Sequence, residues 1–173
     1  MGCRGMHFAL TKEQEEKLLA LPEGDERIIY ITEDIEEAWD EPHLVQSDKA
    51  WDGIHRLLTG YPPEPLVGFK SELIETSGTE GQRLAILGGT QLHSGEDWIV
   101  CFVPADKVPL VAQAMQELDE AAVTERYHRF CKDVWPEYGD IDREYTLEYY
   151  QHVRDFYIRA AVNGRSVIFC ADQ

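Results

Sequence analysis

The chain has 173 residues, of which 43% are hydrophobic and 28% charged, and its 33 acidic against 16 basic residues give a formal net charge of −17. This length suits one domain with its own core, and the hydrophobic share is too high for a disordered chain. Nucleic acids and anionic membranes repel such a charge, because binding to them depends on clustered Lys and Arg. We therefore exclude polyanions as primary partners and expect a single domain over residues 1–173.

No apolar run approaches the about 20 residues of a membrane span, and residues 1–6 lack the long apolar stretch of a signal peptide. The four cysteines form neither a C-x-x-C pair nor a zinc-like cluster. We expect free thiols in a reducing cytoplasm, and we predict no membrane association, no metal and no cofactor.

Apolar periodicity predicts the elements of the first half of the chain. Thr11 and Gln14 have the spacing of a capping box, which begins a helix, and Gly60 suits the left-handed position past a helix end. In chain order we expect a strand at 3–10, a helix from Thr11, a strand or extended loop at 27–31, a helical stretch at 33–41, a helix at 48–59 that Asp48 caps, and a loop at 61–82.

The second half predicts further strands and helices. In chain order we expect a strand at 84–87, a polar loop at 93–97, a buried strand at 98–103, helices near 104–118 and 123–134, a last helix that begins at Thr146 and ends at Asn163, and a strand at 167–170. Helices and strands do not alternate regularly, so we predict an α+β fold with a small central sheet flanked by several helices. The first and last strands would pair at its centre.

Residues 48–59 carry the strongest candidate site. On a helix, Trp51 and His55 share one face, which Asp48 and Asp52 border. A histidine beside two carboxylates would have a raised pKa and could act as an acid or a base. Asp48, Asp52 and His55 could also ligate a metal, because these positions project together.

A purely structural interpretation of the same residues competes with this site, and we favour it. Trp51 would then belong to the core, Asp48 would cap the helix, and Asp52 would pair with Arg56 one turn later. His55 would only hydrogen-bond to a backbone carbonyl.

Two further segments are candidates for binding. Gly88 and Gly89 follow a predicted strand and could let the backbone approach a ligand, although they form no phosphate-binding motif. His93 lies in the predicted polar loop and could join the His55 site. A tight turn and a solvated loop are the structural alternatives, and we favour them.

Aromatic side chains concentrate in the last third of the chain, where nine of the eighteen aromatic residues lie between Tyr127 and Tyr157. At helical spacing most of these rings would be core. Tyr138 and Tyr145, in an acidic connection, are the ones we expect to be exposed, and exposed tyrosines are typical of protein interfaces.

Several stretches of the sequence occur in this order in one known family, namely residues 48–55 (DKAWDGIH), 58–60 (LTG), 86–89 (ILGG) and 103–108 (VPADKV). On these stretches the chain resembles the YfbM-like family of bacterial proteins of unknown function. The resemblance implies a compact α+β domain in a bacterial cytoplasm. It implies no established activity, so no catalytic residue is carried over.

Two functions stay open at this point. The leading hypothesis is a non-enzymatic protein that binds a basic protein partner through its acidic and aromatic surface. The rival is a small-molecule-binding protein or hydrolytic enzyme with its site near Trp51 and His55. The rival predicts a concave pocket in which His55 is partly exposed.

Overall fold

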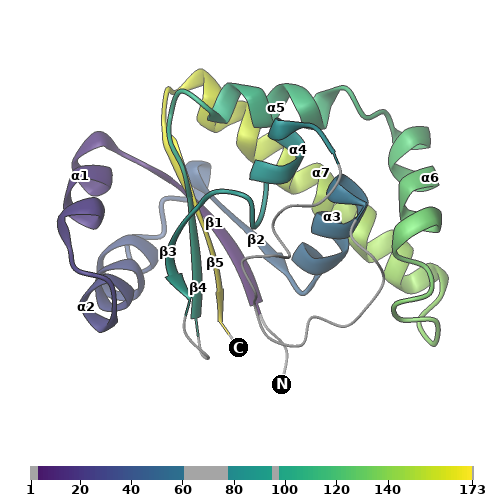
Figure 1. Ribbon diagram of the computed structural model, residues 1–173, viewed down its shortest axis with the longest axis horizontal. Coiled ribbons are helices and arrows are strands. Elements are labelled where there is room, and N and C mark those ends of the chain that lie inside the picture. The colour runs from purple at the N-terminus through teal and green to yellow at the C-terminus, as the bar shows by residue number, and fades with distance from the viewer. Residues whose placement is uncertain (1–3, 61–77, 95–97, 173) are drawn as a thin grey trace.

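Five antiparallel strands form one sheet in residues 4–60, 78–94 and 98–172, the parts of the chain that the computed structural model describes. The strand order is β2-β1-β5-β4-β3, and Figure 1 shows the sheet between two groups of helices. The strands are β1 (Arg4–Leu10), β2 (Leu44–Asp48), β3 (Thr90–Ser94), β4 (Trp98–Val103) and β5 (Ser166–Asp172). The predicted central pairing of the first and last strands is confirmed, with Met6 opposite Cys170.

Alternation along β1 divides the core into two parts, one on each face of the sheet. Met6, Phe8 and Leu10 point to one face and are buried there. His7 and Ala9 point to the other face, and both are buried as well. The sheet is therefore covered on both sides, which places it in the middle of three layers.

The first face is covered by the segment that follows β1. Gln14 N donates to Thr11 Oγ1 at 3.2 Å and Thr11 N donates to Gln14 Oε1 at 2.8 Å, so the predicted capping box is confirmed. The helices of this layer are α1 (Lys12–Ala20), α2 (Asp25–Ile29) and the π-helix η1 (Tyr30–Glu36). The prediction of a strand or loop at 27–31 is wrong, because this run is helical.

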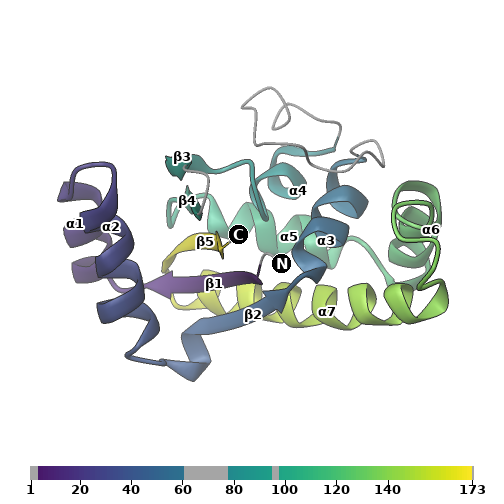
Figure 2. The ribbon, with the colours of Figure 1, turned by 90° about the horizontal axis from the view of Figure 1, so that it is seen from below.

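The second face is covered by the larger group of helices (Figure 2). The long helix α7 (Asp140–Val162) contacts α5 (Val108–Gln116), α3 (Ala50–Thr59) and β2 and lies across this layer. The remaining described helices are η2 (Glu41–His43), which leads into β2, α4 (Glu80–Leu84) and α6 (Glu120–Phe130).

Several predicted boundaries differ from the structure. Residues 84–87 form the end of α4 and a turn, not a strand, and His93 lies within β3, not in a loop. Thr146 does not begin the last helix, because α7 starts at Asp140 and buries Thr146 within it. Most of the predicted loop at 61–82 lies outside the described residues, and its last residues belong to α4.

The fold is α+β, as predicted. In the described part of the chain, none of the helices combines the length and the apolar character that crossing a bilayer requires.

Candidate functional site

Asp48 connects β2 to α3. The prediction that it caps this helix is wrong. The residue at the cap position is Lys49, which offers no side-chain bond to the helix, and Asp48 has a left-handed φ of 42°. Its Oδ2 accepts a 2.7 Å hydrogen bond from the hydroxyl of Tyr145, whose oxygen accepts a bond from Lys49 N at 3.2 Å. Asp48 therefore attaches the start of α3 to α7, and Tyr145 is only partly exposed.

Trp51 belongs to the core, as the structural interpretation predicts. Its side chain is 4% exposed, and its ring lies 5.6 Å from that of Phe169 on β5. Gly5 of β1 makes this contact possible, because a Cβ there would lie 2.7 Å from Trp51 Cδ1. Trp51 thus packs α3 against the sheet and offers no ring face for a ligand to stack on.

His55 is buried, and its pKa moves in the opposite direction to the one the sequence suggested. The residue is 2% exposed. Burial disfavours the charged imidazolium, and the neighbouring Arg56 adds to this effect, so the pKa falls to about 4. His55 is therefore neutral at pH 7, and the partly exposed histidine that the enzyme hypothesis requires is not found at this position.

Asp52 is engaged with Arg56 of the same helix, as predicted. Arg56 Nε donates to both carboxylate oxygens of Asp52, at 3.0 and 2.9 Å, while the Arg56 side chain is 1% exposed. Burial raises the pKa of Asp52, and the charge and hydrogen bonds of Arg56 oppose that rise. The two predicted carboxylates thus bind Tyr145 and Arg56.

The metal alternative requires three ligands that converge. Within residues 4–60, 78–94 and 98–172, no three His, Cys, Asp or Glu side chains are placed to hold a metal ion, and Asp48, Asp52 and His55 form no such group. The described thiols offer no activated nucleophile either, because burial raises the pKa of Cys101 and of Cys131 to about 12.

Gly88 and Gly89 allow a close approach of the backbone to the protein itself. A Cβ on Gly88 would lie 2.3 Å from the carbonyl oxygen of Arg83, and one on Gly89 would lie 2.5 Å from that of Phe102. A side chain at either position would clash with these carbonyl oxygens, so the packing of the backbone explains why both residues are glycine. His93 is half-buried in β3, which forms the edge of the sheet opposite to β2, so it does not join His55 on α3.

His7 is a buried polar residue that our sequence interpretation did not single out. It is fully buried on β1, with its ring 4.9 Å from that of Phe169 and 5.9 Å from those of Phe156 and Tyr157. Burial lowers its pKa to about 3, and the nearby carbonyl of Ala85 partly opposes this. The sequence contained a signal for this burial, because side chains alternate along β1. The alternation places His7 on the same face as Ala9, opposite to Met6 and Phe8.

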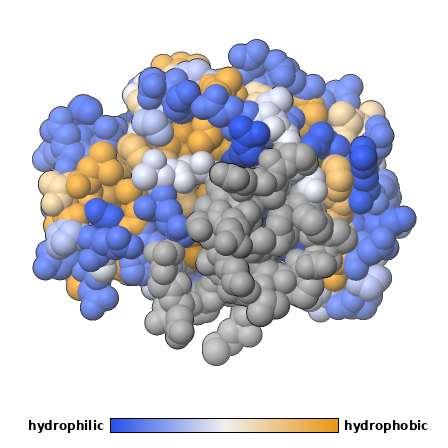
Figure 3. Space-filling model, viewed as in Figure 1, coloured by the Kyte–Doolittle hydropathy of each residue, from blue (hydrophilic) through white to orange (hydrophobic). Residues whose placement is uncertain are grey.

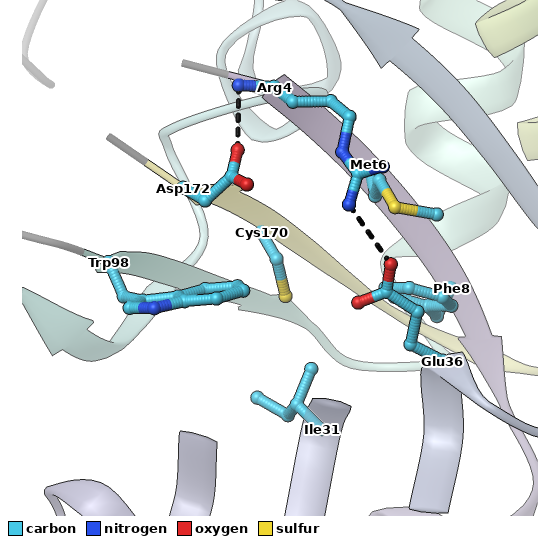
Figure 4. Close-up of a pocket in the computed structure, with 8 residues that line it drawn as sticks. All are labelled: Arg4, Met6, Phe8, Ile31, Glu36, Trp98, Cys170 and Asp172. Carbon is cyan, nitrogen blue, oxygen red and sulfur yellow. Dashed lines mark hydrogen bonds and ion pairs between the residues drawn. The ribbon is translucent and has the colours of Figure 1, made fainter. Parts of the chain in front are cut away.

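A pocket lies on the other face of the sheet, between its strands and η1 (Figure 4). Apolar side chains from the strands and Ile31 form its floor, and charged side chains form its rim. Arg4 Nη2 lies 3.2 Å from Glu36 Oε1, and Arg4 N donates to Asp172 Oδ1 at 2.8 Å. The cavity has a volume of only about 10 Å³, which is room for about one water molecule. Ligand pockets usually have about 300–1,000 Å³, so this one is too small for a ligand of that size.

Comparisons with known proteins identify a family and a fold. A model of the domain of unknown function DUF1877 matches residues 1–170. The crystal structure of YfbM from Escherichia coli, a protein of unknown function, is similar with a TM-score of 0.63 and 14% sequence identity, covering 97% of this chain and 99% of that chain. At this identity the likeness concerns the fold alone. No curated protein matches the chain significantly.

The family match covers almost the whole chain and agrees with the resemblance that the four sequence stretches suggested. The chain therefore belongs to the DUF1877 family, to which no function is assigned.

Proposed function

We propose that this protein is a binding module without enzymatic activity, and that its partner is a basic protein. The observation that carries the proposal is the net charge of −17 in a chain of 173 residues. Such a field attracts cationic partners, speeds their association and repels polyanions.

The arrangement of the basic residues supports this proposal, because part of the positive charge is withdrawn from the surface. Arg27 is 9% exposed and donates to the carbonyl oxygens of Leu92 and Leu21 at 2.5 and 2.6 Å. Arg126 donates to the carbonyls of Leu57 and Leu58. On the face that Figure 3 shows, hydrophilic residues predominate at both ends of the molecule, over α1 and α2 and over α6, with apolar residues among them.

The rival enzyme hypothesis has less support in the described part of the chain. Its central residue, His55, is buried and neutral, and its carboxylates are engaged with Tyr145 and Arg56. Acid–base catalysis needs a titratable group within reach of a substrate. His55 does not meet this requirement.

Selection from a random peptide library on the folded chain at low ionic strength tests the proposal. We expect the recovered peptides to be enriched in Lys and Arg, and to be released by added salt, because exposed charges are screened within about 8 Å at physiological ionic strength. A pull-down of intact proteins at low and high salt is the companion measurement, with recovered proteins expected to be basic.

Recovery of no peptide above background, or recovery of neutral or acidic peptides that salt does not release, would contradict the proposed function. Turnover of a small molecule by the purified chain would favour the enzyme hypothesis instead.

A further inference from the structure

The connection between α6 and α7 exposes large apolar side chains in close succession. Trp135 is 49% exposed, Tyr138 56% and Ile141 74%. Every residue from Trp135 to Ile141 is exposed, so these side chains do not belong to either core. Trp and Tyr are the residue types most enriched among those that dominate the energy of protein interfaces.

Hydrogen bonds hold these three residues close together. Tyr138 N donates to the carbonyl of Trp135 at 3.1 Å, and Ile141 N donates to that of Tyr138 at 3.0 Å. Each bond closes a turn of four residues, whose ends lie within about 7 Å of one another. Gly139, with a φ of 51°, lies inside the second turn. The apolar side chains therefore follow one another along two linked turns at residues 135–141. These turns and the two residues before them are here called the turn segment (residues 133–141).

The turn segment is fastened at both ends, so a partner need not order it. The hydroxyl of Tyr127 on α6 donates to Asp142 Oδ2 on α7 at 2.6 Å, which joins the two helices across the segment. Cys131 Sγ donates to the carbonyl of Gly53 at 3.4 Å and attaches the same region to α3. A surface that is already arranged loses less conformational entropy on binding.

The turn segment is also acidic, with three carboxylates and no basic residue among residues 133–141. Asp140 pairs with Arg143 Nη1 at 2.6 Å. Asp133 and Glu137 are exposed and form no ion pair within the described part of the chain. Two uncompensated negative charges therefore flank the exposed apolar side chains.

We infer that the turn segment is the docking surface for the basic partner, with Trp135, Tyr138 and Ile141 as apolar anchors and Asp133 and Glu137 as the charges that select it. This inference rests on the proposed function and names the surface that performs it. The fitting occupant is a segment with Lys or Arg beside an aromatic or aliphatic side chain. A second copy of this chain fits poorly, because it would place like charges opposite each other.

Two double variants with the same residue types test the anchors. Trp135→Ala with Ile141→Ala removes exposed apolar surface from the turn segment. Trp39→Ala with Ile29→Ala does so elsewhere, at side chains that are 45% and 49% exposed. Titration of the selected basic peptide should show about 30-fold or more weaker binding for the first variant, which is the loss of one dominant interface side chain, and unchanged binding for the second.

A second pair of variants tests the charges. Asp133→Asn with Glu137→Gln removes two of the three negative charges of the turn segment, while Glu23→Gln with Asp25→Asn removes the same charge at the start of α2, at the far end of the molecule in Figure 1. The first variant should bind more slowly and depend less on salt than the second, because charges at the rim of an interface act mainly on the association rate.

The outcomes separate the inference from the proposed function. Binding of the basic peptide by the parent chain, with equal losses in the two apolar variants or with none, would overturn the docking surface and leave the function standing. Failure of the parent chain to bind any basic peptide would overturn both. Unfolding curves of all four variants, expected to match the parent, confirm that the chain remains folded.

Discussion

At the residue scale, several polar side chains are buried within the fold, and only some of them were candidates in the sequence. His55 and Arg56 are buried on α3, and His7 is buried on β1. Burying a polar side chain costs free energy unless it is bonded. Arg56 meets this condition through its ion pair with Asp52 on the same helix.

The two buried histidines make stability depend on pH. Their folded-state pKa values are about 3 for His7 and about 4 for His55, below the unfolded value of 6.5. Because both histidines stay neutral in the folded chain, their full contribution to the free energy of unfolding is present above pH 6.5. It is lost as the pH falls from 6.5 towards the folded-state pKa values, by about 1.4 kcal/mol per pH unit for each histidine. Asp52, whose pKa is raised, acts in the opposite direction.

We therefore expect the free energy of unfolding, measured with urea, to fall by about 3 kcal/mol from pH 7 to pH 5. His55→Gln should lose about half of this difference, whereas His128→Gln, at an exposed position, should keep all of it. An equal free energy at the two pH values would contradict the assignment.

At the element scale, the last carbonyls of α3 receive hydrogen bonds from a side chain of the neighbouring helix α6. The last carbonyls of a helix have no partner within it. Arg126 of α6 donates to the carbonyl of Leu58 at 2.8 Å and also to that of Leu57, and Gly60 ends the helix with a φ of 69°. The glycine signal was visible in the sequence. The arginine was not, because Arg126 lies far from α3 along the chain.

Replacing Arg126 should therefore destabilise the fold although the side chain is partly exposed. We expect Arg126→Met to lower the free energy of unfolding by about 2 kcal/mol, since charge-assisted bonds to carbonyls are lost. Arg129→Met is the matched control, because it replaces an arginine of the same helix that contacts an aromatic ring. The Arg129 guanidinium carbon lies 5.0 Å from the centre of the Phe130 ring. Its effect should stay within about 0.5 kcal/mol. Equal effects of the two substitutions would show that the carbonyl bonds contribute nothing.

Long periodic elements were predictable from the sequence, and short apolar runs were not. The apolar run at Trp98–Val103 and the capping box at Thr11 were located correctly. Residues 27–31 and 84–87 were predicted as possible strands but are helical or in turns, because a short apolar run fits a buried strand and a buried helix equally well. The edge strand β2 was missed, since tertiary pairing with β1 decides its conformation.

Part of the candidate site was predictable from helical spacing, and the part that depends on tertiary contacts was not. Helical spacing correctly placed Trp51 on the core side and Asp52 beside Arg56. It could not show that His55 is buried or that Asp48 bonds to Tyr145 of α7, because both facts depend on the tertiary fold. Composition indicated the acidic surface, but the exposure of Trp135 depends on the tertiary fold.

At the scale of the whole molecule, the sheet is buried between two helical layers, while the acidic charge remains outside. Arg27 is buried against backbone carbonyls and forms no ion pair within the described part of the chain, so the surface is slightly more acidic than the composition alone indicates. The turn segment carries exposed apolar side chains within this acidic surface. In the proposed mode of binding, long-range attraction of a basic partner is combined with short-range apolar contacts.

The affinity of the chain for the selected basic peptide, followed over a range of ionic strength, tests this account most directly. Between about 0.01 M and about 0.15 M salt the screening length falls from about 30 Å to about 8 Å. The account predicts that the affinity falls about 10-fold or more over this range, with the remaining affinity lost in the Trp135→Ala and Ile141→Ala double variant. An affinity that is unchanged by salt, or that increases with it, would contradict the account.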